Sequence, residues 1–86
     1  MANDFEAARF LAAVGENVLI HRETAGLSQE DLASQTGLTL SLIDEIERGR
    51  VDVRLLTLER IAIALNAEMI DLLDVSGTEI GLRNNR

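Results

Sequence analysis

LSQEDLASQTGLTLSLIDEIERG, from Leu27 to Gly49, contains the clearest structural pattern in this chain of 86 residues. Two short segments with helical spacing flank Gly37, and Ser28 and Thr39 each precede one of them. Serine and threonine are favoured before a helix because the side-chain oxygen accepts a hydrogen bond from a free N–H of the first turn. Glycine commonly follows a helix because it adopts the left-handed conformation without strain. The pattern predicts two helices joined by a tight turn.

The first of these two helices has a distinct beginning and end. Acidic residues occupy its first turn, where the helix dipole favours them. Asp31 follows Ser28 by three residues, which is the spacing of a capping box, in which each side chain bonds to the backbone N–H of the other residue. We expect Leu32 and Ala33 to face inward and Gly37 to end the helix in the left-handed conformation.

The second helix is expected to run from Leu40 to about Arg48, with Gly49 ending it. Ile43 and Ile46 have the spacing of a buried stripe, and Leu42 lies at its edge. The remaining positions form an outward face of mixed chemistry, which any partner of this helix would meet. The members of that face are Leu40, Ser41, Asp44, Glu45 and Arg48.

A long helical segment precedes this pair. It opens at Asn3 or Asp4 and reaches about Ala25, either as one long helix or as a short lead-in helix followed by another. Further apolar residues near its beginning exceed what a small helical core needs. Its inward stripe consists of Phe10, Val14, Val18 and His21.

Two further helices are expected after a loop at 50–53. The segment 55–65 is strongly periodic, and Asn66 can end it in the left-handed conformation. The segment 68–73 forms a short fifth helix. No proline interrupts any segment and no β-branched run alternates with period two, so the fold class is all-α. The inward stripe of the fourth helix consists of Leu55, Leu58, Ile61, Ala62 and Leu65.

Composition narrows the class of protein. A chain of this length forms one domain, and without cysteine it has neither a disulfide nor a thiolate metal site. Phe5 and Phe10 are the only aromatic residues, which removes the stacking platforms that bind single-stranded nucleic acids. The apolar runs are too short to span a bilayer and the N-terminus lacks a signal pattern, so we expect a soluble, cytoplasmic protein with no membrane partner.

Enzymatic chemistry fits the sequence poorly, and we expect no catalytic residue, metal or cofactor. His21 is the single histidine, and the periodicity assigns the partners that a triad or a metal site would need to other faces. We interpret His21 as a packing residue, with a pH-sensing or ligand-binding role as the alternative. Gly26, Gly37 and Gly49 mark helix ends and do not form a phosphate-binding loop.

The order and spacing of these features resemble the lambda-repressor/Cro-like helix-turn-helix family, also called XRE. The resemblance runs from about Val18 to Leu73. It implies a compact five-helix DNA-binding domain at 1–75 with its motif at 28–49. The sequence adds an extended first helical segment and, from the glycines and asparagines after Ser76, a loose C-terminal tail at 76–86 that is flexible or takes part in dimerisation. The residues that carry the resemblance are Arg22, Gly26-Leu27-Ser28-Gln29, Leu32-Ala33, Gly37, Ile43, Ile46-Glu47-Arg48-Gly49, Leu55, Leu58, Ile61-Ala62, Ala64-Leu65 and Leu72-Leu73.

The resemblance also implies an ion pair between Arg22 and Glu47. Arg22 lies on the core side of the first helix, and Glu47 follows the buried Ile46 on the second motif helix. Such a pair would clamp the first helix to the recognition helix, and its role would be structural. Two independent, solvated charges are the alternative.

For DNA contact, the resemblance implies that Gln29 contacts the DNA backbone or supports base reading, and that Leu40 and Ser41 reach base edges. Leucine can pack on a thymine methyl group, serine can bond several bases, and Asp44 can only accept, as from cytosine N4. The predicted DNA-binding residues are Ser28, Gln29, Thr39, Leu40, Ser41, Asp44, Glu45, Arg48, Arg50 and Arg54.

Arginines gather just after the recognition helix. Arg48, Arg50, Arg54 and Arg60 place half of all positive charge at its end and in the fourth helix. Such a cluster is typical of an edge that contacts phosphates, because backbone contacts position a protein on the duplex. Ordinary solvated arginines paired with neighbouring carboxylates are the alternative.

The net charge conflicts with the basic footprint of DNA-binding domains, since 15 acidic residues face 8 arginines and leave a charge of −7. Nonspecific affinity should therefore be weak and steeply salt-dependent, whereas local arginines and two half-sites still allow specific binding. We predict a sequence-specific regulator of transcription, a repressor or controller of bacterial or phage type, that binds double-stranded DNA as a homodimer on a two-fold symmetric operator. The alternative is a protein-interaction module on the same scaffold, with weak or no DNA binding, that docks a partner through Leu40 and Leu42.

Two apolar surfaces can supply the dimer interface. One consists of Phe5, Phe10 and Leu11 on the first helix, and the other consists of Met69, Ile70 and Leu73 on the fifth. Restriction-modification controller proteins and antitoxin-type repressors are similar in size and layout, and nothing in the sequence separates these two kinds of regulator.

Overall fold

Five helices, and no strand, make up residues 4–76, the part of the chain that this computed structural model describes. The all-α prediction is confirmed, and the first segment forms one helix of 21 residues. The elements are α1 (Asp4–Thr24), α2 (Gln29–Thr36), α3 (Leu40–Glu47), α4 (Leu55–Ala64) and α5 (Met69–Leu73). Residues 1–3 and 77–86, which include nearly all of the predicted tail, lie outside the described residues.

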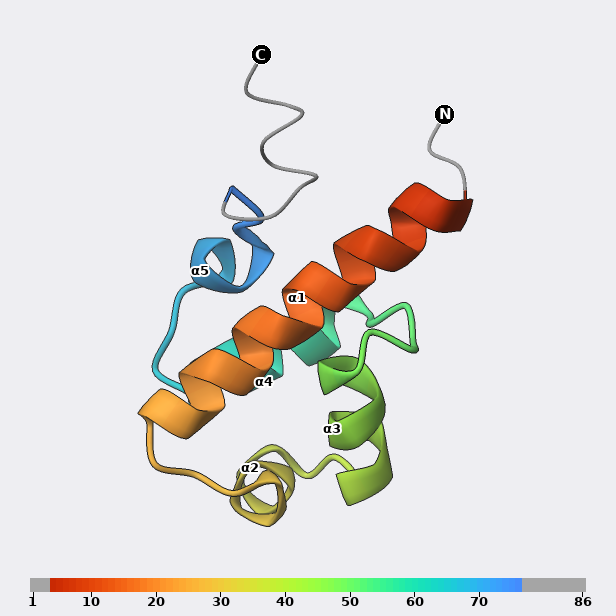
Figure 1. Ribbon diagram of the computed structural model, residues 1–86. Helices are drawn as coiled ribbons and strands as arrows, with labels where there is room; N and C mark the ends of the chain where they lie inside the picture. The colour runs from red at the N-terminus through yellow and green to blue at the C-terminus, as the bar shows by residue number, and fades with distance from the viewer. Residues whose placement is uncertain (1–3, 77–86) are drawn as a thin grey trace.

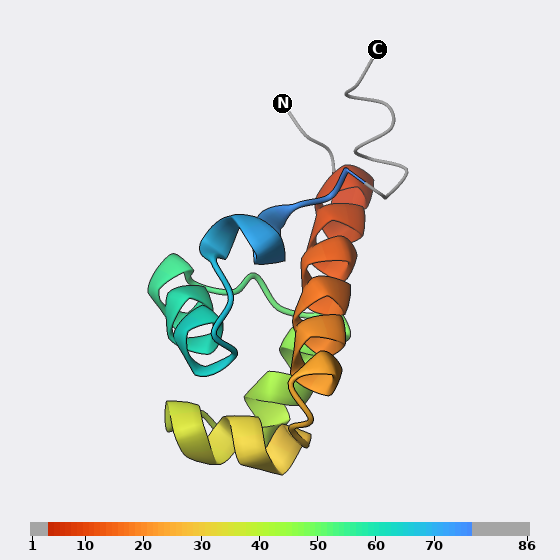
Figure 2. The same cartoon turned by 90° about the vertical axis from the view of Figure 1, so that its left-hand side faces the viewer.

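The long helix α1 lies across the rest of the molecule (Figure 1). It packs against α3 and α5, while α2 packs against α3 and α4, and α4 packs against α5. Seen from the side, α2 lies at one end of the molecule, and the beginning of α1 lies at the other end (Figure 2). None of the helices within residues 4–76 has both the length and the apolar character needed to cross a membrane.

The core is aliphatic and receives side chains from all five helices. The spacing of apolar residues predicted most of it, because one face of each helix must be covered by a neighbour. Burying such side chains stabilises a fold by roughly 1.5–3 kcal/mol each relative to leaving them in water. The buried cluster consists of Val14, Val18, Leu32, Ile43, Ile46, Leu58, Ile61, Ala62, Leu65 and Leu72.

Two members of the predicted inward stripes are exposed. Leu55 is 67% exposed and Phe10 is 38% exposed. Both lie toward the N-terminal end of their helix and line an open apolar pocket, so their neighbours do not cover them fully. Periodicity identifies the correct face of a helix, but it does not say how much of that face a neighbour covers. His21, the fourth member of the first stripe, is half buried, and its Nδ1 donates to the carbonyl oxygen of Asn17 at 2.9 Å.

The predicted helix ends are confirmed. Ser28 Oγ accepts from the N–H of Asp31 at 2.9 Å, and the Asp31 carboxylate accepts from the N–H of Ser28 at 3.0 Å, which completes a capping box. Thr39 Oγ1 accepts from an N–H in the first turn of α3 at 3.1 Å. Gly37 and Asn66 adopt left-handed φ angles of 75° and 55°. Local hydrogen bonds therefore set where α2 and α3 begin.

Two contacts hold α1 to its neighbours at short range. A Cβ on Gly15 would collide with two carbonyl oxygens at the end of α3, so only glycine allows α1 and α3 to approach this closely. Asn17 Nδ2 donates to the carbonyl oxygens of Leu72 at 2.9 Å and Asp74 at 2.7 Å, which ties the end of α5 to α1. The first contact defines the position of α3 against α1, and the second defines the position of the end of α5.

Candidate nucleic-acid interface

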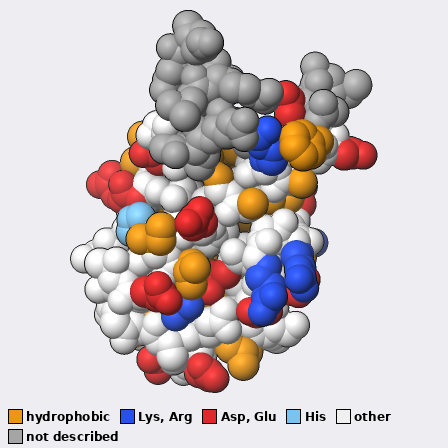
Figure 3. All heavy atoms as spheres, viewed as in Figure 1, with side chains coloured by type: hydrophobic (Ala, Val, Ile, Leu, Met, Phe, Trp, Pro, Cys, Tyr) orange, Lys and Arg blue, Asp and Glu red, His pale blue; other side chains and the backbone are white. Residues whose placement is uncertain are grey.

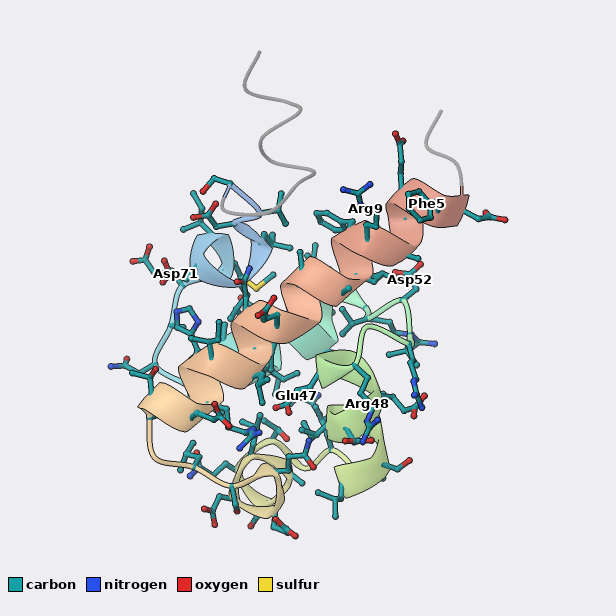
Figure 4. The ribbon with its side chains drawn as sticks, in the orientation of Figure 1. Phe5, Arg9, Glu47, Arg48, Asp52 and Asp71 are labelled. Carbon is teal, nitrogen blue, oxygen red and sulfur yellow. The ribbon has the colours of Figure 1, made fainter. Side chains whose placement is uncertain are left out.

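Helix α3 presents to solvent the face that its periodicity predicted. Leu40 is 43% exposed, Ser41 and Arg48 are exposed, and Asp44 and Glu45 are half exposed. Arg48 lies on the outer side of α3, whereas its neighbour Glu47 points toward α1 (Figure 4). Adjacent residues of an α-helix point about 100° apart around its axis, which separates these two side chains.

The structure brings Arg22 and Glu47 together under α3. Arg22 Nε donates to Glu47 Oε2 at 2.6 Å, and Arg22 Nη2 donates to Glu47 Oε1 at 3.1 Å. The third nitrogen, Nη1, donates to the carbonyl oxygen of Leu27 at 2.8 Å. The two side chains are only 10% and 4% exposed, and the carboxylate raises the pKa of the guanidinium. The pair therefore joins α1, α3 and the start of the helix-turn-helix at one point.

Gln29 extends this contact to the solvent-facing side of α3. Its Nε2 donates to Glu47 Oε1 at 2.9 Å and to Asp44 Oδ1 at 3.3 Å. The sequence pattern did not predict this bridge, because 18 and 15 residues separate the partners and no periodicity spans the turn between two helices. A polar residue at the first position of α2 was the only available indication. Gln29 thus links the buried pair to a residue predicted to face DNA.

The carboxylates on α3 already have basic partners. Arg48 Nε donates to Asp44 Oδ2 at 2.9 Å, and Arg50 Nη1 lies 3.9 Å from Glu45 Oε2. The bonds from Gln29 and then from Arg48 lower the pKa of Asp44. Asp44 therefore remains charged at neutral pH, and the two ion pairs partly neutralise the arginines beside α3.

All four arginines of the predicted basic edge have exposed side chains. Arginine and carboxylate side chains lie together beside α3 in the space-filling view (Figure 3). Arg48, Arg50 and Arg54 are exposed, and Arg54 occupies the N-cap of α4 without a side-chain capping bond. Arg60 is also exposed, and its Nη1 donates to the carbonyl oxygen of Thr36 at 3.4 Å. The arginines are therefore exposed, as phosphate contact requires, and Arg48 and Arg50 also lie beside carboxylates, as the alternative interpretation expects.

The predicted DNA-binding residues also include the N-cap residues of α2 and α3. Ser28 and Thr39 are exposed, and their hydroxyl oxygens accept from the first turns of α2 and α3. A hydroxyl that accepts a hydrogen bond still has a proton to donate, so both groups can donate a hydrogen bond to an anion at the N-terminus of the helix. Both hydroxyl groups thus stand at the N-terminus of a helix of the motif.

A family model described as Helix-turn-helix matches residues 20–79, which is more than half of the chain. The chain belongs to this helix-turn-helix family. An uncharacterized HTH-type transcriptional regulator of Methanothermobacter thermautotrophicus is 40% identical over 62 residues, which cover 69% of this chain and 90% of the relative. Control protein C.SmaI of Serratia marcescens is 40% identical over 73 residues, which cover 85% of this chain and 82% of that protein.

Solved helix-turn-helix structures are similar over most of the chain. The restriction-modification controller protein C.AhdI from Aeromonas hydrophila superposes with a TM-score of 0.70 at 37% identity, covering 72% of this chain and 94% of that one. The clp gene regulator ClgR from Corynebacterium glutamicum superposes with a TM-score of 0.77 at 25% identity, covering 88% and 81%. These matches confirm the resemblance that the motif residues indicated, and they support DNA-binding transcription regulation as the function of this helix-turn-helix fold.

Proposed function

We propose that this helix-turn-helix protein regulates transcription in the cytoplasm of a bacterium by placing α3 in the major groove of an operator. The observation that carries the proposal is the division of α3 into two sides. A buried ion pair holds its inner side to α1, and its outer side is free to meet a partner. A firmly held helix with an exposed outer side is what recognition in the major groove requires. The role is regulatory rather than catalytic.

Base reading falls to the first turns of α3. Ser41 can donate to or accept from several base edges, and Leu40 can pack on the methyl group of thymine. Asp44 can only accept, so it favours the N4 amino group of cytosine or the N6 amino group of adenine. Gln29 holds one oxygen of Asp44, which orients the carboxylate and supports base reading without a direct contact.

Positioning on the duplex falls to the groups around α3. Arg48, Arg50 and Arg54 contact phosphates, and the hydroxyl groups of Ser28 and Thr39 donate to phosphates at the two helix N-termini. The partner carboxylates, Asp44 and Glu45, reduce the attraction to any DNA and make the fit to a particular sequence more important. The net charge of −7 acts in the same direction.

The protein acts as a homodimer on an operator with two-fold symmetry. An exposed apolar surface on α4 and α5, which we name the α4–α5 face, supplies the contact. Leu56 is the most exposed of its members, at 75%, and a group of exposed large apolar side chains marks an interaction site. Two recognition helices would then lie about 34 Å apart, one turn of DNA. The members of the α4–α5 face are Leu55, Leu56, Met69, Ile70 and Leu73.

A selection from random duplexes at low salt tests the proposal. We expect the natural protein to enrich one two-fold symmetric sequence, and Ser41→Ala and Asp44→Asn to change which bases are enriched. Asp44→Asn should also raise affinity for all sequences, because it removes a charge that repels phosphate. Glu23→Gln, on the exposed surface of α1, is the matched control for loss of a carboxylate elsewhere. No enrichment at any salt concentration would contradict DNA binding.

The exposure of Leu40 supports a second candidate, a protein-interaction module. An apolar side chain that is 43% exposed and flanked by acidic residues can anchor a partner protein. In that case Leu40→Ala would abolish capture of the partner, and DNA affinity would be negligible. If α3 reads DNA, the same substitution removes one methyl contact and costs little.

A further inference from the structure

The first turns of α1 extend beyond the elements that pack on the rest of the helix (Figure 1). Every residue from 4 to 10 is exposed or half exposed, and Phe5 is 66% exposed. Phe5 lies at the N-terminal end of α1, with Arg9 beside it (Figure 4). The Arg9 guanidinium carbon lies 5.2 Å from the centre of the Phe5 ring. The chain therefore presents an aromatic ring on a projecting helix.

An open apolar pocket lies beside α1, where the exposed first turns meet the rest of the helix. It has a volume of 190 Å³ and connects α1 with α4 and α5. A dry apolar cavity of about 150 Å³ is large enough for benzene, so the pocket can accept a phenyl ring. Its lining includes Phe10, Leu11, Val53, Leu55 and Leu73, with the carboxylate-bearing Asp52 among them.

Phe5 cannot fill the pocket of its own copy. Five residues separate it from Phe10, which places it roughly 7.5 Å further along the axis and about 140° around the helix. An α-helix is too rigid to bring both side chains to one point. Burial of Phe5 in such a pocket therefore requires a second copy of the chain.

We propose that in the homodimer the Phe5 ring of each copy enters the α1–α4–α5 pocket of the other. This inference rests on the proposed homodimer and extends its interface. Leu55 and Leu73 belong both to the pocket and to the α4–α5 face, so the two surfaces are continuous. Each copy has one ring and one pocket, which is the self-complementary arrangement that a two-fold axis needs.

Two further observations favour a second copy as the occupant. The α4–α5 face alone is short, since helices of ten and five residues span about 15 and 7.5 Å, whereas stable interfaces engage about 20–30 residues a side. The projecting turns of α1 enlarge it. The charges also match, because Arg9 beside the entering ring would approach Asp52 at the pocket.

Sedimentation of the full chain and mixed-label NMR together test this inference. Phe5→Ala should raise the dimer dissociation constant about tenfold or more, because buried aromatic anchors dominate interfaces. It should leave the unfolding midpoint of the monomer unchanged, because the ring is exposed there. Ile20→Ala, which also removes an exposed side chain of α1, should change neither quantity. In a mixture of labelled and unlabelled copies, we expect contacts between the Phe5 ring of one copy and Val53 and Leu73 methyl groups of the other.

The possible failures are distinguishable. A dimer that tolerates Phe5→Ala and shows no inter-copy contacts from Phe5 would overturn this inference and leave the proposed function intact. Phe5 contacts found only within one copy, including contacts to residues 77–86, would overturn it in the same way. A chain that stays monomeric at high micromolar concentration would contradict the homodimer itself and the inference with it.

Discussion

Glu47 is the residue at which the inner and outer sides of α3 are connected. Its carboxylate accepts two bonds from Arg22 and one from Gln29, and the same glutamine amide reaches Asp44 on the exposed face. A carboxylate in such a dry place requires this many donors, because an unpaired buried charge is strongly destabilising. A single residue thus determines both how firmly α3 is held and how Asp44 is oriented.

The first prediction concerns the coupling between Arg22 and Glu47. In a double-mutant cycle, Arg22→Ala and Glu47→Ala should show an interaction free energy on the order of 1 kcal/mol or more. Each single substitution should cost roughly 3–5 kcal/mol, because it leaves the other charge buried without its partner. Urea unfolding of the four proteins gives the measurement. Additive effects would show that the two side chains contribute independently, and Arg22→Lys should recover little because lysine lacks the planar fork.

At the scale of the element, α2 begins through hydrogen bonds that depend on charge. The backbone and side-chain bonds from Ser28 lower the pKa of Asp31. A carboxylate whose pKa is lower in the folded state stabilises the fold above its unfolded pKa, which is about 4 for aspartate. That contribution is lost as the pH falls through the lower, folded value. The start of the helix-turn-helix is therefore sensitive to acid.

The second prediction concerns this cap. The natural protein should be more stable than Asp31→Ala at pH 7, and the difference should shrink progressively below about pH 4. Urea unfolding at a series of pH values measures the difference, in which the acid sensitivity of the other carboxylates cancels. Ser34→Ala, also exposed on α2, should give a difference that does not vary with pH. A constant difference for Asp31→Ala would remove the charge from the explanation.

The third prediction concerns the basic edge at the end of α3. Arg48→Ala, Arg50→Ala and Arg54→Ala should each weaken binding to all DNA sequences and reduce the salt slope by at most about one, as expected for a lost phosphate contact. Arg48 and Arg50 already face carboxylates, so phosphate must displace those partners and the change there should be the smaller. Ile20→Ala, which removes an exposed side chain of α1 away from this edge, is the control. Unchanged slopes in all three variants would place the DNA surface elsewhere.

At the scale of the whole molecule, the distribution of charge and apolar surface matters more than the totals. A net charge of −7 opposes DNA, but some arginine side chains lie together beside α3 (Figure 3). Several large apolar residues are exposed to solvent on α4, on α5 and at the start of α1. A monomer that leaves so many large apolar side chains in water indicates an association surface.

The fourth prediction concerns assembly. Leu56→Asp should dissociate the homodimer, because it places a charge within the apolar α4–α5 face. It should leave the fold intact, because the leucine is already 75% exposed. Binding to duplexes with two half-sites should fall to the level of a single half-site. Sedimentation and gel shifts with half-sites about 34 Å apart and at altered spacing measure both effects. An unaffected dimer would move the interface away from this face.

The sequence by itself determined the features that depend on bonds and spacings of a few residues. The capping pair Ser28 and Asp31, the left-handed Gly37 and the buried stripe of Ile43 and Ile46 follow from contacts within one or two helical turns. The ion pair of Arg22 and Glu47 spans 25 residues, and only the resemblance to a known family indicated it.

Only the tertiary structure decided which predicted faces are covered and which distant groups meet. The bridge from Gln29 to Asp44, the bonds from Asn17 to the end of α5, and the exposure of Leu55 depend on the packing of separate helices. The period of a helix specifies the direction of a side chain, but not the distance to the next element. That distance is set by the packing of several helices at once, and the close approach at Gly15 is one contact that defines it.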